Sequence, residues 1–166
     1  MRKKFKVFYE DKENLSELIL PIGIPGSGKS FWIKEFNKDN KYIVVSPDNI
    51  RKEITGNISD QSQNSKVFWM AIEATKRALE NGDSVIFDAT NVDSQQRKNL
   101  VSEMPKDIKL KAKILYVDPQ EAKRRVRKDI LAGKNRANVP VDIIDIMQKK
   151  FEHTLTVIKD EGFELI

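Results

Sequence analysis

The sequence predicts an α/β fold in which helices cover both faces of a parallel β-sheet. Short apolar runs rich in Val, Ile and Leu alternate about five times with stretches that carry apolar residues at helical spacing. A glycine-rich loop, GIPGSGKS, directly follows the first complete apolar run. The chain has 166 residues, of which 39% are hydrophobic, which is enough for one domain with a buried core.

The first half of the chain follows this pattern closely. ELILPIG at 17–23 predicts a strand that leads into the glycine loop and a helix at about 29–37. YIVVS at 42–46 is β-branched and predicts a buried parallel strand. Pro47 suits the first turn of the helix that follows this strand. Strand, turn and helix therefore succeed one another from residue 17 onward.

The second half continues the alternation. A long helix is predicted at 64–81, because its apolar residues recur at helical spacing and Gly82 is a stop signal. Trp69 on this helix is expected to pack in the core or a groove rather than to stack on a base. The remaining predictions are a strand at 84–88, a helix at 93–104, a strand at 109–118, a helix at 119–131, a helix from Pro140 and a last strand in GFELI.

Composition excludes several classes of protein. The absence of cysteine rules out disulfides and cysteine metal sites. No apolar run reaches 18 residues and the first residues are charged, so we expect a cytoplasmic protein without a membrane span. Residues 1–15 are predicted to form a charged extension, in which Phe5, Val7 and Tyr9 alternate, ahead of a single domain at 16–166. The net charge of +5 is compatible with a polyanionic partner.

The glycine loop has the spacing of a phosphate-binding loop, a glycine followed by four residues and then Gly-Lys-Ser. Glycines allow successive backbone N–H groups to converge on phosphate oxygens at the start of a helix. Lys29 would bridge the β- and γ-phosphates and Ser30 would bind Mg²⁺. The sequence therefore predicts a P-loop NTPase-type domain that binds a nucleoside triphosphate. The residues expected at the nucleotide are Gly23, Pro25, Gly26, Ser27, Gly28, Lys29 and Ser30.

Two further strands deliver polar residues to the same edge of the predicted sheet, where ligands bind in open α/β folds. Asp48 and Arg51 follow the second strand at i and i+3, so they share one face of a helix. Phosphoryl transfer needs a carboxylate to accept the acceptor's proton and cations to bind phosphate, and these two residues suit those roles. The alternative is that Asp48 is only a carboxylate at a helix N-terminus, stabilised by the helix dipole, and that Arg51 is a surface arginine.

Asp88 follows the third strand, in VIFDATN. An acid at this point can hold Mg²⁺ or its water shell, and it can equally fix Arg51. Ala89 stands where ATPases that drive motion usually carry a second acid, which favours transfer to a bound acceptor over hydrolysis.

The segment AGKNRANVP interrupts two helices and is predicted to be part of a short lid near 127–139. This segment overlaps the end of a basic run, in which seven of the 14 residues from Lys123 to Arg136 are Lys or Arg. Such a run is often a solvated helix face. Arg127, Lys134 and Arg136 are candidates to offset charge as the β–γ bond breaks, and the sequence does not choose between them.

Four segments in order resemble the kinase domain of the phage-type polynucleotide 5′-hydroxyl kinases, a branch of the small P-loop kinases. They are ILPIGIPGSGKSFW, SPDNIR, SVIFDATNVDSQQRK and NRANVPVDIIDIM, which cover most of residues 18–150. The wider group shares DATN and a closing DEGF, here Asp160 to Phe163. The phosphate loop alone is common, but its combination with D-x-x-R, DATN and an arginine before Val-Pro is specific.

The resemblance implies transfer of the γ-phosphate of ATP, or another NTP, to the 5′-hydroxyl of a DNA or RNA end, with a role in nucleic acid repair. Lys29 and Ser30 would hold donor and metal, and Asp48 would be the general base. The residues implied at the acceptor are Asp48, Arg51, Asp88, Thr90, Asn91 and Arg97. The resemblance also implies that Ser30 and Asp88 bind the metal and that Arg127 contacts the nucleotide. The cation of the lid would be Arg136 or Lys134.

The sequence also departs from the family pattern. Pro47 stands before Asp48 where polar residues are usual, and no D-x-D phosphatase pair follows the kinase segments. Kinases of nucleoside monophosphates, nucleosides or modified bases remain alternatives, because they vary the acceptor on the same scaffold. A regulatory NTP-binding module without chemistry is a further alternative. The family also contains multimers, so a homo-oligomer is compatible with the resemblance.

Overall fold

The computed structural model describes residues 15–134 and 137–166, so the predicted extension at 1–15 lies almost entirely outside the described residues. The alternation of strands and helices predicted from residue 17 onward is confirmed. In chain order the elements are β1 (Glu17–Ile22), α1 (Lys29–Phe36), β2 (Tyr42–Val45), α2 (Pro47–Thr55), α3 (Asn64–Glu80), β3 (Ser84–Phe87), α4 (Ser94–Ser102), β4 (Lys109–Ile114), α5 (Pro119–Leu131), α6 (Val141–Val157) and β5 (Glu164–Leu165).

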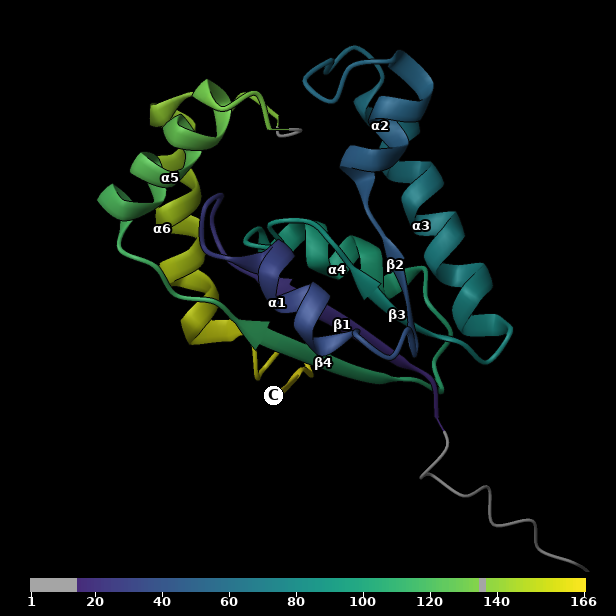
Figure 1. The fold of residues 1–166 in the computed structure, drawn as a ribbon. Helices are drawn as coiled ribbons and strands as arrows, with labels where there is room; N and C mark the ends of the chain where they lie inside the picture. The colour runs from purple at the N-terminus through teal and green to yellow at the C-terminus, as the bar shows by residue number, and fades with distance from the viewer. Residues whose placement is uncertain (1–14, 135–136) are drawn as a thin grey trace, which may run out of the picture.

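The five strands form one parallel sheet in the order β2-β3-β1-β4-β5, which confirms the predicted fold class (Figure 1). β1 is central, pairing with β3 through Leu18 and Val85 and with β4 through Leu18 and Leu110. Residues 18 to 20 of β1 are fully buried, as expected of a strand with neighbours on both sides and helices on both faces. The carboxyl end of this central strand carries the glycine loop.

The two faces of the sheet differ in how much core they bury. Alternate residues of β1 point to opposite faces. Leu18 and Leu20 belong to the larger core, to which α3, α4 and α6 also contribute. Ile19 faces the other side, where it packs with Ile86 and with Ile33 of α1 in a small cluster. Figure 1 shows α1 lying across this second face.

β2 is not the buried strand that its sequence predicts. It lies at the edge of the sheet, where Ile43 is 43% exposed and Val44 is 41% exposed. The β-branched composition predicted the strand correctly, but it could not predict which position in the sheet the strand would take. Only Val45, at the carboxyl end of β2, is buried, and it joins the larger core.

The prediction that Trp69 packs in the core or a groove is also wrong, since this side chain is 61% exposed. Val67, Ala71 and Thr75 form the buried stripe of α3, and Trp69 projects from the opposite side of the helix. Two strands are shorter than predicted: β4 ends at Ile114 and β5 spans only two residues. Within the described residues, no helix is long and apolar enough to cross a membrane.

Candidate active site

The phosphate loop connects β1 to α1 and is shaped by close backbone contacts. A Cβ added to Gly23 would lie 2.3 Å from Ser27 Oγ and 2.8 Å from Leu115 O. Gly26 combines a φ of +85° with a similar approach, since its Cβ would lie 2.7 Å from Ala122 O. Both positions therefore require glycine, because a side chain would push the loop away from β4 and α5.

Lys29, the first residue of α1, is held inside this loop. Its Nζ donates to the carbonyl oxygens of Gly23 at 2.7 Å and Ile24 at 3.0 Å. The ammonium is thus held close to the loop backbone, and its neighbour Ser30 is exposed at the start of the helix. The roles predicted for these two residues at the donor phosphates and the metal stay predictions.

The DATN segment after β3 braces the phosphate loop. Gly23 N donates to Thr90 O at 3.1 Å. The Asn91 side chain donates to Pro21 O at 2.9 Å and to Phe87 O at 3.0 Å, so it joins the ends of β1 and β3. Asn91 itself has a φ of 54°, a left-handed conformation that asparagine tolerates better than most residues. Thr90 and Asn91, predicted at the acceptor, therefore act in this structure as supports of the donor loop.

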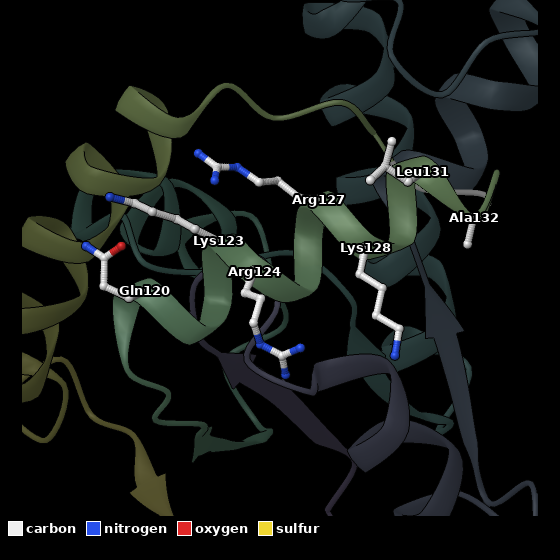
Figure 2. A pocket seen from close by; sticks show the side chains of 7 residues that line it. All are labelled: Gln120, Lys123, Arg124, Arg127, Lys128, Leu131 and Ala132. Atoms are coloured by element: carbon white, nitrogen blue, oxygen red, sulfur yellow. The ribbon is translucent and has the colours of Figure 1, made fainter.

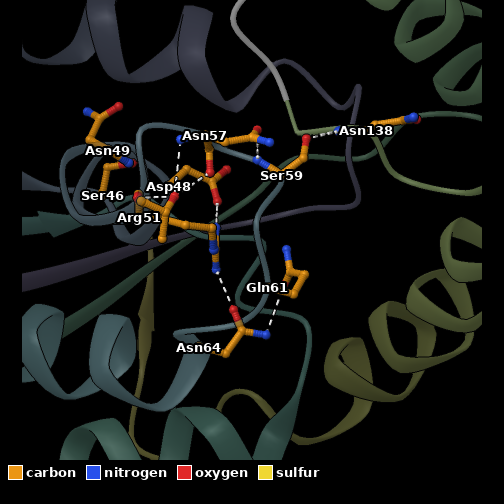
Figure 3. A network of polar contacts seen from close by, with 10 residues as sticks. Ser46, Asp48, Asn49, Arg51, Asn57, Ser59, Gln61, Asn64 and Asn138 are labelled. Atoms are coloured by element: carbon orange, nitrogen blue, oxygen red, sulfur yellow. Dashed lines mark hydrogen bonds and ion pairs between the residues drawn. The ribbon is translucent and has the colours of Figure 1, made fainter.

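Asp48 and Arg51 lie in the first turns of α2 and form an ion pair, as their spacing predicts (Figure 3). Ser46 caps this helix by accepting a hydrogen bond from Asn49 N, and Pro47 occupies its first turn. The Arg51 side chain is only 6% exposed, whereas that of Asp48 is 51% exposed. The pair therefore presents an accessible carboxylate beside a buried guanidinium.

Asn64, the first residue of α3, is a partner of Arg51 that sequence reasoning missed. Its Oδ1 accepts a hydrogen bond from Arg51 Nη2 at 3.1 Å. An asparagine at a helix start is usually assigned to capping, so its type and position gave no signal of this contact. Arg51 is thus held by Asp48 and Asn64, rather than by Asp88 as one sequence-based alternative proposed.

Asp88, which follows β3, is affected by the charges of both Lys29 and Asp48. Burial raises the pKa of its carboxyl group above the usual value; the positive charge of Lys29 opposes that rise and the negative charge of Asp48 adds to it. Its backbone N–H donates to Val45 O at 2.8 Å, so the ends of β3 and β2 are joined. The segments after β1, β2 and β3 that carry Lys29, Asp48 and Asp88 therefore lie at the carboxyl edge of the sheet, as predicted.

These residues fit a magnesium ion better than a metal with an all-protein cage. Residues 15–134 and 137–166 contain no group of three His, Cys, Asp or Glu that could hold a metal. Mg²⁺ usually takes one or two protein oxygens and completes its shell with water and substrate phosphates. The hydroxyl of Ser30 and the carboxylate of Asp88 suit that limited role.

Arg97 lies apart from the acceptor residues with which the sequence grouped it. Its side chain is 1% exposed, and its Nε and Nη2 donate to the carboxylate of Glu161 at 2.7 and 2.8 Å. Its Nη1 donates to Asn91 O at 2.7 Å and to Thr154 Oγ1 at 2.9 Å. Arg97 therefore reaches the site only through the backbone of the DATN segment, which it ties to the DEGF segment.

The predicted lid is described in part. Arg136 lies outside the described residues, and Lys134 pairs with Asp129 at 2.9 Å. Asn138 N donates to Ser59 Oγ at 3.0 Å, which brings the start of the segment before α6 against the loop between α2 and α3. Figure 1 shows the segment before α6 and the loop after α2 approaching each other at the same end of the molecule.

The basic run on α5 has two different faces. Arg125 Nη1 donates to Gly26 O at 3.1 Å, a contact with the phosphate loop that sequence reasoning missed. Arg127 instead lies on the outer side of α5, in an open hollow (Figure 2). The residues that line this hollow are Gln120, Lys123, Arg124, Arg127, Lys128, Leu131 and Ala132. The predicted contact of Arg127 with nucleotide stays a prediction.

The parallel sheet and the arrangement of the phosphate loop define the class of this protein, an α/β domain with a P-loop kinase-like fold. Residues 18–154 match the model of the AAA_33 family, described as an AAA domain, and the chain belongs to this family.

Comparison with individual proteins gives more specific relatives. A protein of Acanthamoeba polyphaga mimivirus, named "Putative bifunctional polynucleotide phosphatase/kinase", is 32% identical over 87 residues, which are 52% of this chain and 17% of that protein. A chain of the Pnkp1/Rnl/Hen1 RNA repair complex shares the fold with a TM-score of 0.75 and 20% identity, over 91% of this chain and 47% of that chain. This chain therefore spans less than half the length of either relative.

The same fold also occurs in kinases of small molecules. A gluconokinase from Sinorhizobium meliloti 1021 has a TM-score of 0.51 and 20% identity, over 82% of this chain and 74% of that chain. Fold similarity at this level of identity does not distinguish between acceptors.

Proposed function

We propose that this protein transfers the γ-phosphate of ATP, or another NTP, to the 5′-hydroxyl end of DNA or RNA. The observation that carries the proposal is the Asp48–Arg51 pair, which follows β2 at the same carboxyl edge of the sheet as the phosphate loop. A nucleotide switch would need Lys29 and Ser30 but no accessible carboxylate beside a buried arginine. The arrangement therefore supports transfer to a second substrate.

In the proposed reaction, the Asp48 carboxylate accepts the proton of the acceptor hydroxyl as its oxygen attacks the γ-phosphorus. A new O–P bond forms while the bond between the γ-phosphorus and the β–γ bridging oxygen breaks, which releases the nucleoside diphosphate. Lys29 and the loop N–H groups hold the donor phosphates, and Arg51 binds a phosphate of the acceptor. Ser30 and Asp88 would hold Mg²⁺, which would supply positive charge to offset that of the donor phosphates.

Two observations favour a polynucleotide acceptor over a small one. The named activity of the mimivirus relative includes polynucleotide kinase, and the identity of 32% spans about half of this chain. The guanidinium of Arg51 is buried and held from two sides, a geometry that suits a fixed phosphate near the reacting hydroxyl. The 5′-terminal nucleotide of a DNA or RNA strand carries such a phosphate on its 3′ side.

The test is label transfer from γ-labelled ATP with Mg²⁺. The acceptors offered in parallel are a 5′-OH DNA oligonucleotide, a 5′-OH RNA oligonucleotide, nucleosides and nucleoside monophosphates. We expect label on the oligonucleotides, and the two arms then distinguish DNA from RNA. Label only on a nucleoside or mononucleotide would reject the proposal and assign the Asp48–Arg51 pair to a small acceptor. Release of phosphate without any acceptor would indicate an NTPase.

A further inference from the structure

We propose that Asn64 is a positioning residue that holds Arg51 for the acceptor's phosphate. The proposal rests on the proposed function, because it deepens the role of Arg51 in binding the acceptor. Asn64 opens α3 and Arg51 lies 13 residues earlier on α2, so the contact joins two helices (Figure 3).

The donors of the Arg51 guanidinium are divided between fixed partners and an unused group. Nη1 pairs with Asp48, and Nη2 donates to Asn64 Oδ1 at 3.1 Å. Nε is buried and has no hydrogen-bond partner within the described part of the chain. A buried N–H without a partner costs free energy, and an oxygen of a bound phosphate would satisfy it. Nε and the second N–H groups of Nη1 and Nη2 are therefore the donors that this arrangement leaves for the acceptor.

A second contact uses the other side of the Asn64 amide. Asn64 Nδ2 donates to Gln61 Oε1 at 2.6 Å. Since a guanidinium can only donate, Arg51 requires the oxygen of Asn64 on its side, and the nitrogen of Asn64 then turns to the oxygen of Gln61. The loop that carries Gln61 is itself ordered by local bonds, with Ser62 N donating to Asp60 Oδ1 at 2.8 Å.

Asn64 supplies a hold on Arg51 that Asp48 cannot maintain through the reaction. As the proposed general base, Asp48 gains a proton during transfer, and its attraction for the guanidinium then falls. The carbonyl of Asn64 is neutral throughout, so its hydrogen bond does not depend on the protonation of Asp48. The arginine therefore keeps one fixed anchor while the charge on its other partner changes.

The experiment measures KM for the acceptor and for ATP separately, in wild type, Asn64→Ala, Asn64→Asp and Gln63→Ala. Asn64→Ala removes the anchor, and we expect the acceptor KM to rise roughly 10- to 150-fold, the scale of one hydrogen bond to a charged group, with the ATP KM unchanged. Asn64→Asp keeps an oxygen for Arg51 and should stay within about 3-fold of wild type. Gln63→Ala is the matched control, since this neighbouring side chain makes no capping bond and its loss should change neither constant.

A double-mutant cycle with Arg51→Lys decides whether Asn64 acts through the arginine. Lysine keeps the charge but lacks the fork that Asn64 holds. We expect Asn64→Ala to have little further effect on the acceptor KM in the Arg51→Lys protein, because the two residues act as a unit. Additive effects of the two substitutions would overturn the proposal, and so would an unchanged acceptor KM in Asn64→Ala.

Binding of a fluorescent 5′-OH oligonucleotide gives a readout independent of turnover. Asn64→Ala should weaken this binding by a similar factor while its thermal unfolding midpoint stays near that of wild type. Equal binding by wild type and Asn64→Ala would overturn the positioning role. If wild type phosphorylates only a small acceptor, the proposed function fails, and the same cycle on the KM of that acceptor still decides the role of Asn64.

Discussion

Two buried arginines, Arg97 and Arg51, show how similar side chains differ in purpose. Arg97 donates to Glu161, Thr154 and a backbone carbonyl, and both members of its ion pair are almost fully buried. Arg51 is nearly as buried, but its carboxylate partner is half-exposed and its Nε has no partner within the described residues. A guanidinium whose donors are mostly used holds a fold together, whereas one with a spare buried donor beside an accessible carboxylate suits a ligand.

The largest expected effect is the loss of stability caused by the substitution Arg97→Met. The substitution leaves the Glu161 carboxylate buried without its partner, which typically costs about 3–5 kcal/mol. Denaturant unfolding should show this loss. Replacing both residues, as Arg97→Met with Glu161→Leu, should recover much of it, because no charge then remains buried. A stability near wild type for the single variant would refute the structural role of Arg97.

The next effect is on turnover, from Asp48→Asn. Loss of the general base should reduce turnover roughly 10²-fold or more, while nucleotide binding and the unfolding midpoint remain close to wild type. Steady-state kinetics and an ATP-binding titration measure the two quantities. Lys29→Ala is the contrasting variant, since it should weaken the donor side and nucleotide binding itself. Unchanged turnover in Asp48→Asn would remove this carboxylate from catalysis.

A smaller effect is expected on the stability of the protein at acid pH. Burial alone would raise the pKa of Glu161, but hydrogen bonds from Arg97 and Ser94 and the charge of Arg97 outweigh it, so the pKa is lowered. A carboxyl group whose pKa is lower when folded stabilises the protein above its unfolded pKa, and that contribution is lost as pH falls through the folded pKa. Stability measured against pH should therefore fall on the acid side less steeply in the Arg97→Met/Glu161→Leu protein than in wild type.

The smallest expected effect is that of Arg51→Met on stability. Asp48 is half-exposed and can be solvated once the arginine is gone, so the unfolding free energy should change by less than about 1 kcal/mol. Transfer to the acceptor should nevertheless fall strongly. A destabilisation as large as that of Arg97→Met would show that the two arginines do not differ as proposed.

Local spacing determined much of the site. The phosphate loop and the Asp48–Arg51 pair depend on residues that are close in sequence, where the geometry of one turn or one helix fixes their positions. The contact of Arg51 with Asn64 spans two helices, and that of Arg97 with Glu161 spans 64 residues, so neither follows from a spacing rule. The grouping of Arg97 with the acceptor residues came from the family resemblance, although its side chain is buried in the structure.

By itself the sequence determined the order of strands and helices from residue 17 onward, the parallel sheet and the residues of the phosphate loop, because these depend on short-range periodicity and turn chemistry. Tertiary structure decided which strand lies at the edge of the sheet, which aromatic of α3 is exposed, and which partners each buried arginine finds. Those outcomes depend on how elements distant in sequence pack against one another, and an individual element's pattern is compatible with several such packings.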